Sequence, residues 1–393
     1  MNKVYNITID EMEALNEADY ILADLRDNHT FQYGSIPNAV NIPFDTLEET
    51  SISLPFDKKI IFYCSRGIYS NMAVSKLRDK GLAAYSLSGG YSEWLRDKLS
   101  GDTSQENQKK TCEDVEKSIQ KKFHKSLFTK FAKAINTYDL IQPGDKIAVC
   151  ISGGKDSMLM AKLFQELKRH NKFPFELVFL VMDPGYNETN RMVIEDNAQK
   201  LRIPITIFET NIFDSVVNIE KSPCYLCARM RRGYLYSKAQ ELGCNKIALG
   251  HHYDDVIETI LMGMLYGGQI QTMMPKLHSQ NFKGMELIRP MYLIREEDIR
   301  HWRDYNDLYF IQCACRFTDT CSTCSADGSS NSRRMEIKNL ILKLKETNPT
   351  VESNIFRSVE NVNLNTVIEY KRDGIRHHFL EHYDRNEGKI EEG

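Results

Sequence analysis

The chain has 393 residues, which at about 150 residues per domain predicts two or three domains. A hydrophobic fraction of 41% and a charged fraction of 27% are typical of globular proteins and exclude a wholly disordered chain. The formal net charge is −3, so any RNA site would have to be a local basic patch.

The sequence contains no feature that predicts a membrane or secreted protein. No apolar run approaches the roughly 20 residues of a membrane helix. The N-terminus reaches Asp10 and Glu11 before any apolar segment of the kind found in secretory signals. We therefore expect a cytoplasmic protein without a membrane partner. The ten cysteines are then expected to be buried thiols, metal ligands or nucleophiles and not a disulfide scaffold.

Residues 1–100 predict a first α/β domain. The apolar runs at 20–24 and 59–63 are typical of buried strands, and residues 71–80 carry apolar side chains at helical spacing. Residues 101–110 are polar and contain no aliphatic side chain, which is the composition of a linker. We place the linker at 101–115.

A second domain is expected over residues 116–365. It opens with a predicted helix that repeats Ile119, Phe123, Leu127, Phe131 and Ile135 among many lysines. The basic face of this helix fits a solvated surface or a contact with an RNA backbone.

Strands and helices then alternate along the second domain. We predict strands at 146–151, 176–182, 205–208 and 246–249, and helices at about 156–170, 192–201 and 255–266. Such alternation predicts an α/β fold with a parallel, Rossmann-like sheet that binds ligands at the carboxyl ends of its strands. Residues 366–393 are expected to be a charged C-terminal tail, with a frayed helix or tail from about Tyr370.

The strand at 146–151 runs directly into a glycine-rich turn that opens a helix, which is an anion site by construction. Two glycines let the backbone approach an anion, the first helical N–H groups point at it, and Lys155 adds a charge. The turn is not a Walker loop, because Val149 stands where that motif requires its first glycine. It resembles the Ser-Gly-Gly-x-Asp-Ser loop of the N-type ATP pyrophosphatases, which cleave ATP between its α- and β-phosphates. The resemblance implies ATP as a substrate and assigns the loop to it: Ser152, Gly153, Gly154, Lys155, Asp156 and Ser157.

A second element supports nucleotide binding. Gly250 follows the strand at 246–249, and Asp254 with Asp255 comes shortly after it. This carboxylate pair is expected to hold Mg²⁺ through water or, alternatively, to do no more than cap the next helix. We include Gly250, Asp255 and Met182, which ends the strand at 176–182, among the ATP-binding residues, and we name Lys155 and Asp156 as catalytic.

The cysteines Cys224 and Cys227 have the spacing of two metal or iron–sulfur ligands. Further cysteines follow about 90 residues later, and these could complete the site, form a zinc site of their own, or leave the first pair as a redox dithiol. They are Cys313, Cys315, Cys321 and Cys324.

Over roughly residues 122–356 these motifs, with His251, Glu258 and the later Arg289-Pro290, together resemble the tRNA 2-thiocytidine synthetase family. That resemblance implies a 4Fe-4S cluster on three cysteines, with Cys224, Cys227 and Cys313 as the metal ligands. Cys315 competes for the third position, because the family's usual Pro-Cys-x-x-Cys is altered here. The resemblance does not explain the pair Cys321 and Cys324.

The strand at 59–63 ends at Cys64, in a loop whose backbone N–H groups and Arg66 favour a thiolate. Together with Asp24-Leu25-Arg26, residues 34–39 and residues 89–94, this loop resembles the rhodanese family over about residues 4–98. The resemblance implies that Cys64 is catalytic and carries sulfur as a persulfide. Ser35 and Tyr69 depart from the family pattern, and a catalytically silent rhodanese fold is the alternative.

The sequence thus predicts an N-terminal rhodanese domain fused to a PP-loop ATP pyrophosphatase that thiolates a pyrimidine of tRNA, with cytidine suggested by the resemblance. ATP, Mg²⁺ and a 4Fe-4S cluster are the expected cofactors, and a cysteine desulfurase or thiosulfate is the expected sulfur donor. Arg229, Arg231 and Arg232 are candidate RNA contacts. The alternatives are a cluster-free thiolase that uses a catalytic disulfide, a persulfide carrier that binds ATP only as a regulator, and a small-molecule substrate. A homodimer is possible, because apolar helix faces serve a core and an interface equally well.

Overall fold

The structure is a computed structural model that describes residues 5–47, 57–78, 81–100, 110–170, 173–186, 188–212, 223–311, 333–381 and 383. Within these ranges the side chains of residues 29, 32–33, 99–100, 189 and 223–228 are not described. The described residues group into two compact units, the first within Met1–Asp255 and Met274–Met335, the second within Val256–Met273 and Glu336–Gly393. None of the described helices has the length and apolar composition that crossing a membrane requires.

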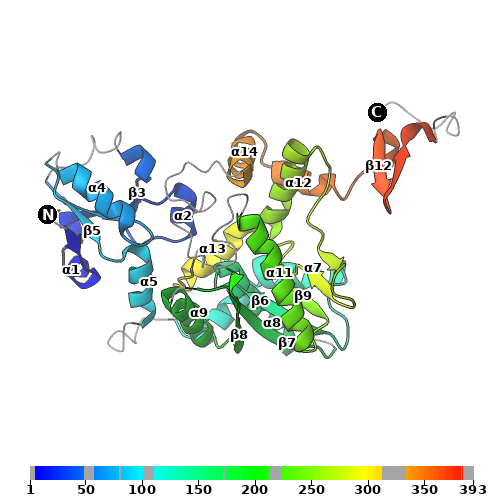
Figure 1. Ribbon diagram of the computed structural model, residues 1–393, viewed down its shortest axis with the longest axis horizontal. Helices are drawn as coiled ribbons and strands as arrows, with labels where there is room; N and C mark the ends of the chain where they lie inside the picture. Colours follow the sequence, from blue (N-terminus) through cyan, green and yellow to red (C-terminus); the bar gives the residue numbers. More distant parts are fainter. Residues whose placement is uncertain are drawn as a thin grey trace. The chain divides into compact units, whose positions relative to one another are not determined.

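The N-terminal part of the first unit, drawn in blue in Figure 1, contains a five-stranded sheet of order β1-β5-β4-β2-β3. Every pairing in this sheet is parallel. One face of β4 packs against α4 through Ile60 and Phe62, and the other face packs against α1 and α5 through Ile61 and Tyr63. The elements are β1 (Asn6–Ile7), α1 (Ile9–Glu13), β2 (Tyr20–Asp24), α2 (Asn28–Tyr33), β3 (Val40–Asn41), β4 (Lys59–Tyr63), α4 (Ile68–Arg78), β5 (Ala84–Leu87) and α5 (Gly90–Ser100), with 3-10 turns at Glu17–Asp19 and Phe44–Thr46.

The second sheet has six strands in the order β10-β11-β9-β6-β7-β8, and all pairings except β10 with β11 are parallel. The strands of this sheet and the helices between and around them are α6 (Cys112–Gln120), α7 (Thr129–Thr137), β6 (Lys146–Ile151), α8 (Lys155–His170), β7 (Glu176–Asp183), α9 (Glu188–Lys200), β8 (Ile205–Glu209), α11 (Pro223–Glu241), β9 (Lys246–Ala248), α12 (Tyr253–Gly267), β10 (Lys276–His278), β11 (Glu286–Ile288) and α13 (Glu296–Tyr305).

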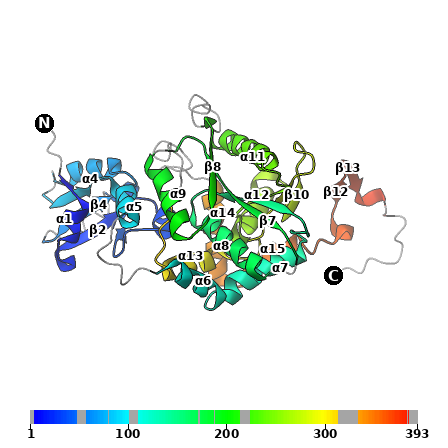
Figure 2. The ribbon, with the colours of Figure 1, turned by 90° about the horizontal axis from the view of Figure 1, so that it is seen from below.

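Alternate residues of β6 serve the two faces of this sheet. Ile147 and Val149 join the core that α8, α9 and α13 build, whereas Ala148 and Cys150 pack towards α11. Figure 2 shows α11 on one side of β7 and α8 with α13 on the other. Because a strand buried on both faces is typical of a parallel sheet between helices, the predicted α/β class is confirmed.

The predicted basic helix keeps its buried stripe but is not continuous. All five of its repeating apolar residues are buried. Between α6 and α7, however, residues His124–Phe128 form a π-helical turn. Just before it, the N–H of Phe123 donates to the Ser118 carbonyl, five residues back, at 2.8 Å. The wider turn absorbs one extra residue between the two helices.

The C-terminal prediction is wrong where the structure describes the chain. Instead of a frayed helix or tail from about Tyr370, strands β12 (Glu369–Arg372) and β13 (Ile375–His378) form an antiparallel hairpin. Asp373 and Gly374 both have positive φ, at 53° and 80°, as a two-residue hairpin turn requires. The other elements of the second unit are α14 (Arg333–Thr347), which begins in the first unit, α15 (Val351–Ser358), and 3-10 turns at Leu364–Thr366 and Phe379–Glu381.

Candidate functional site

The turn between β6 and α8 is built around Gly153. Its φ is +85°, and a Cβ at this position would lie 2.5 Å from Cγ1 of Ile194 and 2.7 Å from Cδ1 of Ile311. Conformation and space therefore both require glycine. The Ser157 hydroxyl closes the turn: it accepts from the Ser152 N–H at 3.2 Å and donates to the Gly154 carbonyl at 3.0 Å.

A cavity of about 450 Å³ opens beside this turn. It lies at the carboxyl ends of β6, β7 and β9, where a parallel sheet is expected to bind its ligand. Of the residues predicted to bind ATP, the cavity brings together Ser152, Asp156, Ser157, Met182, Gly250 and Asp255. Its other lining residues are Cys150, Ile151, Arg231, Arg232, Leu235, Leu249, His251 and Arg334.

The aspartates after β9 do not act as a matched pair. Asp255 lines the cavity, accepts from the His252 N–H at 2.9 Å and forms an ion pair with Arg334. Asp254 instead accepts from the N–H of Glu296 at 2.7 Å and pairs with Arg295 at 3.1 Å, which fixes it to the start of α13. Asp255 thus satisfies the N-terminus of α12, as the capping interpretation expected, while its carboxylate also faces the cavity.

Charge around the cavity changes the protonation of its groups. Burial alone would raise the pKa of Asp255, but the charges of His252 and Arg334 lower it, so the carboxylate stays ionised. Burial, together with the charges of Arg289 and Arg334, lowers the pKa of His251 to about 4. Nδ1 of His251 is buried and has no hydrogen-bond partner among the described residues, which leaves a neutral imidazole on the cavity wall.

Lys155 does not line this cavity, although the sequence predicted that it faces the anion. Its side chain is 1% exposed, and its Nζ lies 3.1 Å from Oδ1 of Asp156 and 3.2 Å from Oε1 of Glu296. Glu296 is a residue that the sequence analysis missed. The catalytic role of Lys155 stays a prediction, and two carboxylates hold its ammonium.

Positive charge on the cavity wall comes from distant parts of the chain. Arg231 and Arg232 lie on α11, and Arg334 lies at the start of α14. Arg231 and Arg232 were candidate RNA contacts in the sequence. Arg334 and His251 were not predicted to have a role, and no local pattern marks Arg334, which reaches the cavity only through the fold.

The structure describes the candidate cluster cysteines only in part. Cys224 and Cys227 lie at the start of α11. Arg231, which lines the cavity, follows Cys224 by seven residues and Cys227 by four, so the backbone of Cys224 lies about two helical turns before Arg231 and that of Cys227 about one turn. Their side chains lie outside the described part of the chain. Outside it altogether lie Cys313, Cys315, Cys321 and Cys324.

Cys64 directly follows β4 and is 1% exposed. Its Sγ accepts from the Gly67 N–H at 3.2 Å and lies 3.8 Å from Oγ of Ser70. Gly90 must be glycine here, because its Cβ would lie 2.3 Å from the Cys64 carbonyl oxygen. The thiol therefore occupies a tight loop in which the Gly67 N–H points at sulfur, and the sulfur-carrier role of Cys64 stays a prediction.

Behind this loop lies a buried polar network. Arg26 is 2% exposed, donates through Nε to Asp24 at 2.9 Å and lies 4.0 Å from the centre of the Tyr91 ring. The hydroxyl of Tyr63, which precedes Cys64, accepts from the Ile36 N–H at 3.1 Å. These contacts fix the end of β4 and hence the start of the Cys64 loop.

Comparison with known proteins identifies both parts of the chain. A PP-loop domain model matches residues 119–315, and a rhodanese-like domain model matches residues 8–97. The tRNA-cytidine(32) 2-sulfurtransferase of Coxiella burnetii (strain RSA 493 / Nine Mile phase I) is 35% identical over 64% of this chain and 95% of its own. The protein of that name from Anaeromyxobacter dehalogenans (strain 2CP-C) is 33% identical over 61% of this chain and 80% of its own.

The chain belongs to the tRNA-cytidine(32) 2-sulfurtransferase family. The predicted combination of a rhodanese domain and a PP-loop domain is confirmed, and so is the predicted enzyme class, an ATP-dependent sulfurtransferase of tRNA thiolation. Among solved structures, the U34-tRNA thiolase NcsA from Methanococcus maripaludis with its 4Fe-4S cluster has 22% identity over 59% of this chain and 76% of its own, with a TM-score of 0.47.

Proposed function

We propose that this member of the family 2-thiolates a cytidine of tRNA, and that it does so by adenylating the base and then replacing its oxygen with sulfur. One observation carries the proposal: the residues that flank the glycines of the turn, the ionised Asp255, and arginines from α11 and α14 all line one cavity. Such a cavity fits an anionic nucleotide, because backbone N–H groups and arginines bind its phosphates.

Two carboxylates at the cavity fit Mg²⁺. Asp156 and Asp255 both line it, and hard oxygen ligands of this kind bind Mg²⁺ together with substrate phosphates. In the proposed reaction the carbonyl oxygen of the base attacks the α-phosphorus of ATP, and pyrophosphate leaves. Arg231 and Arg232 offset the charge that develops on the phosphates.

In the second step sulfide attacks the activated carbon of the base, and AMP leaves with the oxygen. The sulfur arrives as the outer atom of a persulfide on Cys64, and a thiol reductant supplies the two electrons that convert it to sulfide. We propose Cys224, Cys227 and Cys313 as ligands of a 4Fe-4S cluster, since cysteine thiolates are the ligands that hold such clusters. When bound, the cluster supplies an open iron position for sulfur.

The test uses the full chain purified without oxygen and supplied with tRNA, ATP, Mg²⁺, sulfide and a thiol reductant. We expect release of pyrophosphate and formation of 2-thiocytidine, measured by mass spectrometry of digested tRNA. The variant C224S should lose the iron and the thiolation. C244A is the matched control, because Cys244 is buried in the core and is not among the residues that line the cavity.

Two results would contradict the proposal. A fully active enzyme that contains no iron would exclude the cluster and favour a catalytic disulfide. Pyrophosphate release that small metabolites stimulate and tRNA does not would exclude tRNA as the substrate.

A further inference from the structure

The rhodanese domain contacts the PP-loop domain through the side chain of Trp94 on α5. Trp94 is 2% exposed, and its ring meets the ring of Tyr309 edge-on, with 5.1 Å between the centroids and 85° between the planes. Tyr309 belongs to the segment that follows α13. An edge-to-face pair of this kind is a favourable and directional contact.

The same helix is fixed to the loop that carries Cys64. The Tyr91 N–H donates to the Cys64 carbonyl at 2.9 Å, and the Ser92 N–H donates to the Ser65 carbonyl at 3.0 Å. Tyr91 also stacks on Trp94 with 5.7 Å between ring centroids. The position of Trp94 therefore determines where the Cys64 loop lies.

On the other side of the contact, the backbone of Tyr309 is fixed to α9. Its carbonyl accepts from Nδ2 of Asn197 on α9 at 2.9 Å, and Asn197 is fully buried. Two residues later, Ile311 packs on Gly153 so closely that a Cβ on the glycine would lie 2.7 Å from its Cδ1. Tyr309 thus belongs to a short segment that touches the rhodanese domain at one end and the glycine turn at the other.

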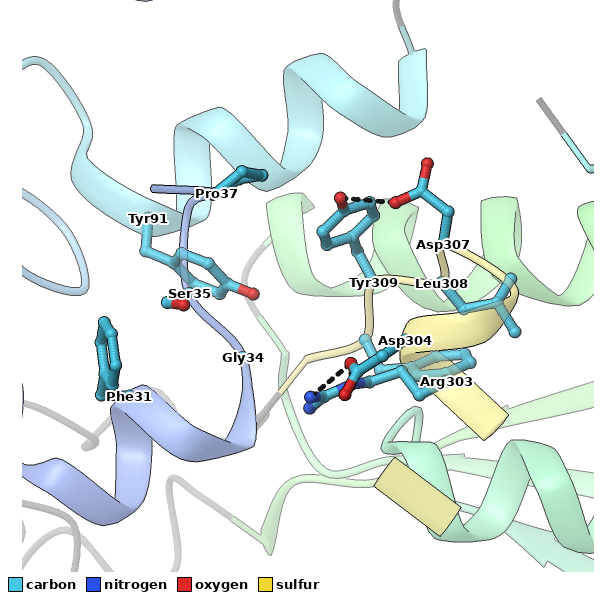
Figure 3. A pocket seen from close by; sticks show the side chains of 11 residues that line it. Phe31, Gly34, Ser35, Pro37, Tyr91, Arg303, Asp304, Asp307, Leu308 and Tyr309 are labelled. Carbon is cyan, nitrogen blue, oxygen red and sulfur yellow. Dashed lines mark hydrogen bonds and ion pairs between the residues drawn. The ribbon is translucent and has the colours of Figure 1, made fainter. Parts of the chain in front are cut away.

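Beside this contact, the boundary between the two domains contains a pocket. This pocket of about 400 Å³ separates Gly34, Ser35 and Tyr91 of the rhodanese domain from the residues around Arg303 and Tyr309 (Figure 3). The Tyr309 hydroxyl donates to Asp307 at 2.7 Å within its own domain, so it does not join the two sides. Because the two domains are not packed against each other at the pocket, the Trp94–Tyr309 contact beside it adds directly to their adhesion.

We infer that Trp94 and Tyr309 are positioning residues for sulfur transfer: their contact docks the rhodanese domain so that the Cys64 loop is presented to the thiolation site of the same chain. This inference rests on the proposed function and adds how the sulfur is delivered. In the transfer, an acceptor thiolate attacks the outer sulfur of the Cys64 persulfide, and the sulfur–sulfur bond breaks with its electron pair left on Cys64 as thiolate. A thiol reductant then reduces the new persulfide to the sulfide of the second step. A flexible tether alone gives an effective concentration of about the millimolar scale, and docking raises it further.

The test compares two sulfur sources in the full-length enzyme. Cys64 is loaded from thiosulfate, or free sulfide is supplied so that the rhodanese domain is bypassed. We expect W94A and Y309A to form 2-thiocytidine about tenfold more slowly from the Cys64 persulfide, and at the unchanged rate from sulfide. W94F keeps an aromatic ring at the contact and should retain most of the transfer.

A control measurement separates lost docking from a damaged domain. Transfer of sulfur from thiosulfate to cyanide needs only Cys64 and its loop, so the rate of this reaction shows whether W94A has left the loop intact. Y309A lies outside the rhodanese domain and should keep this activity in full. If both variants deliver the Cys64 sulfur to tRNA at the wild-type rate, the inference is wrong.

The proposed function fails in a different way. If C64A forms 2-thiocytidine from thiosulfate as fast as the wild type, Cys64 is not the donor. If the wild type forms no 2-thiocytidine even from sulfide, the proposed reaction itself is wrong.

Discussion

Replacing Gly153 by alanine tests whether the nucleotide turn depends on a close approach that only glycine allows. Gly153 has a φ of +85°, and the new Cβ would lie 2.5 Å from Cγ1 of Ile194 and 2.7 Å from Cδ1 of Ile311. Both neighbours belong to buried side chains of the main core. The substitution therefore strains the backbone and overpacks the core at once.

The two costs can be separated with a matched glycine. Gly144 has nearly the same φ, +86°, but a Cβ there would meet no atom within 4 Å. G144A should lower the free energy of unfolding by roughly 1–2 kcal/mol, the cost of a left-handed backbone for a residue with a Cβ. G153A should lower it by a further 1–3 kcal/mol, roughly, because of overpacking.

Urea denaturation of both variants measures these free energies, and release of pyrophosphate measures the function. If the turn in G153A moves by about 1 Å, pyrophosphate release should fall about 100-fold, whereas G144A should retain it. The double variant G153A/I311V removes the Ile311 Cδ1 atom that the new Cβ would meet. Its free energy of unfolding should therefore fall by less than the sum of the losses in G153A and I311V.

The reasoning is refuted if G153A and G144A are destabilised equally and G153A remains fully active. In that case the contacts of Ile194 and Ile311 would not constrain the turn.

Three further predictions follow from buried charges. Burial lowers the pKa of His251 to about 4 from an ordinary 6.5, so its neutral form stabilises the fold above pH 6.5, and this contribution is lost as the pH falls through 4. Urea titrations should show that H251N loses less stability over that pH range than the wild type, and equal losses would argue against the lowered pKa. R26A leaves Asp24 buried without its partner and should lower the free energy of unfolding by about 3–5 kcal/mol, whereas a loss below about 1 kcal/mol in urea denaturation would contradict the buried pair. K155Q should lower the rate of pyrophosphate release about 100- to 1,000-fold if Lys155 reaches the phosphates during the reaction, and an unchanged rate would confine it to its ion pairs with Asp156 and Glu296.

Local patterns in the sequence were sufficient for four strands of the second sheet and for the glycine turn, but not for β10 and β11. The strand at 146–151 is apolar at every position from Ile147 to Ile151, as a strand buried on both faces must be, and the glycines after it mark the turn directly. The turn places Ser152, Asp156 and Ser157 at the cavity because a strand–turn–helix junction has little freedom. The hairpin at 369–378 also had a local signal, Asp373-Gly374, which the analysis of the charged C-terminus overlooked.

Contacts between distant segments could not be predicted in this way. Spacing cannot show that Glu296, 141 residues after Lys155 in the chain, holds its ammonium, or that Arg334 pairs with Asp255. The division of Asp254 and Asp255 between α13 and the cavity likewise depends on where α13 packs. Periodicity reports which face of an element is buried, but it carries no information about which other element covers that face.

The most direct test of the proposed function is the nucleoside content of tRNA from cells that lack this chain. Mass spectrometry should find no 2-thiocytidine in tRNA from the deletion strain, and expression of the wild-type chain should restore it while K155Q does not. If 2-thiocytidine persists at its normal level in the deletion strain, and no second enzyme with this activity is present, then this chain does not thiolate cytidine.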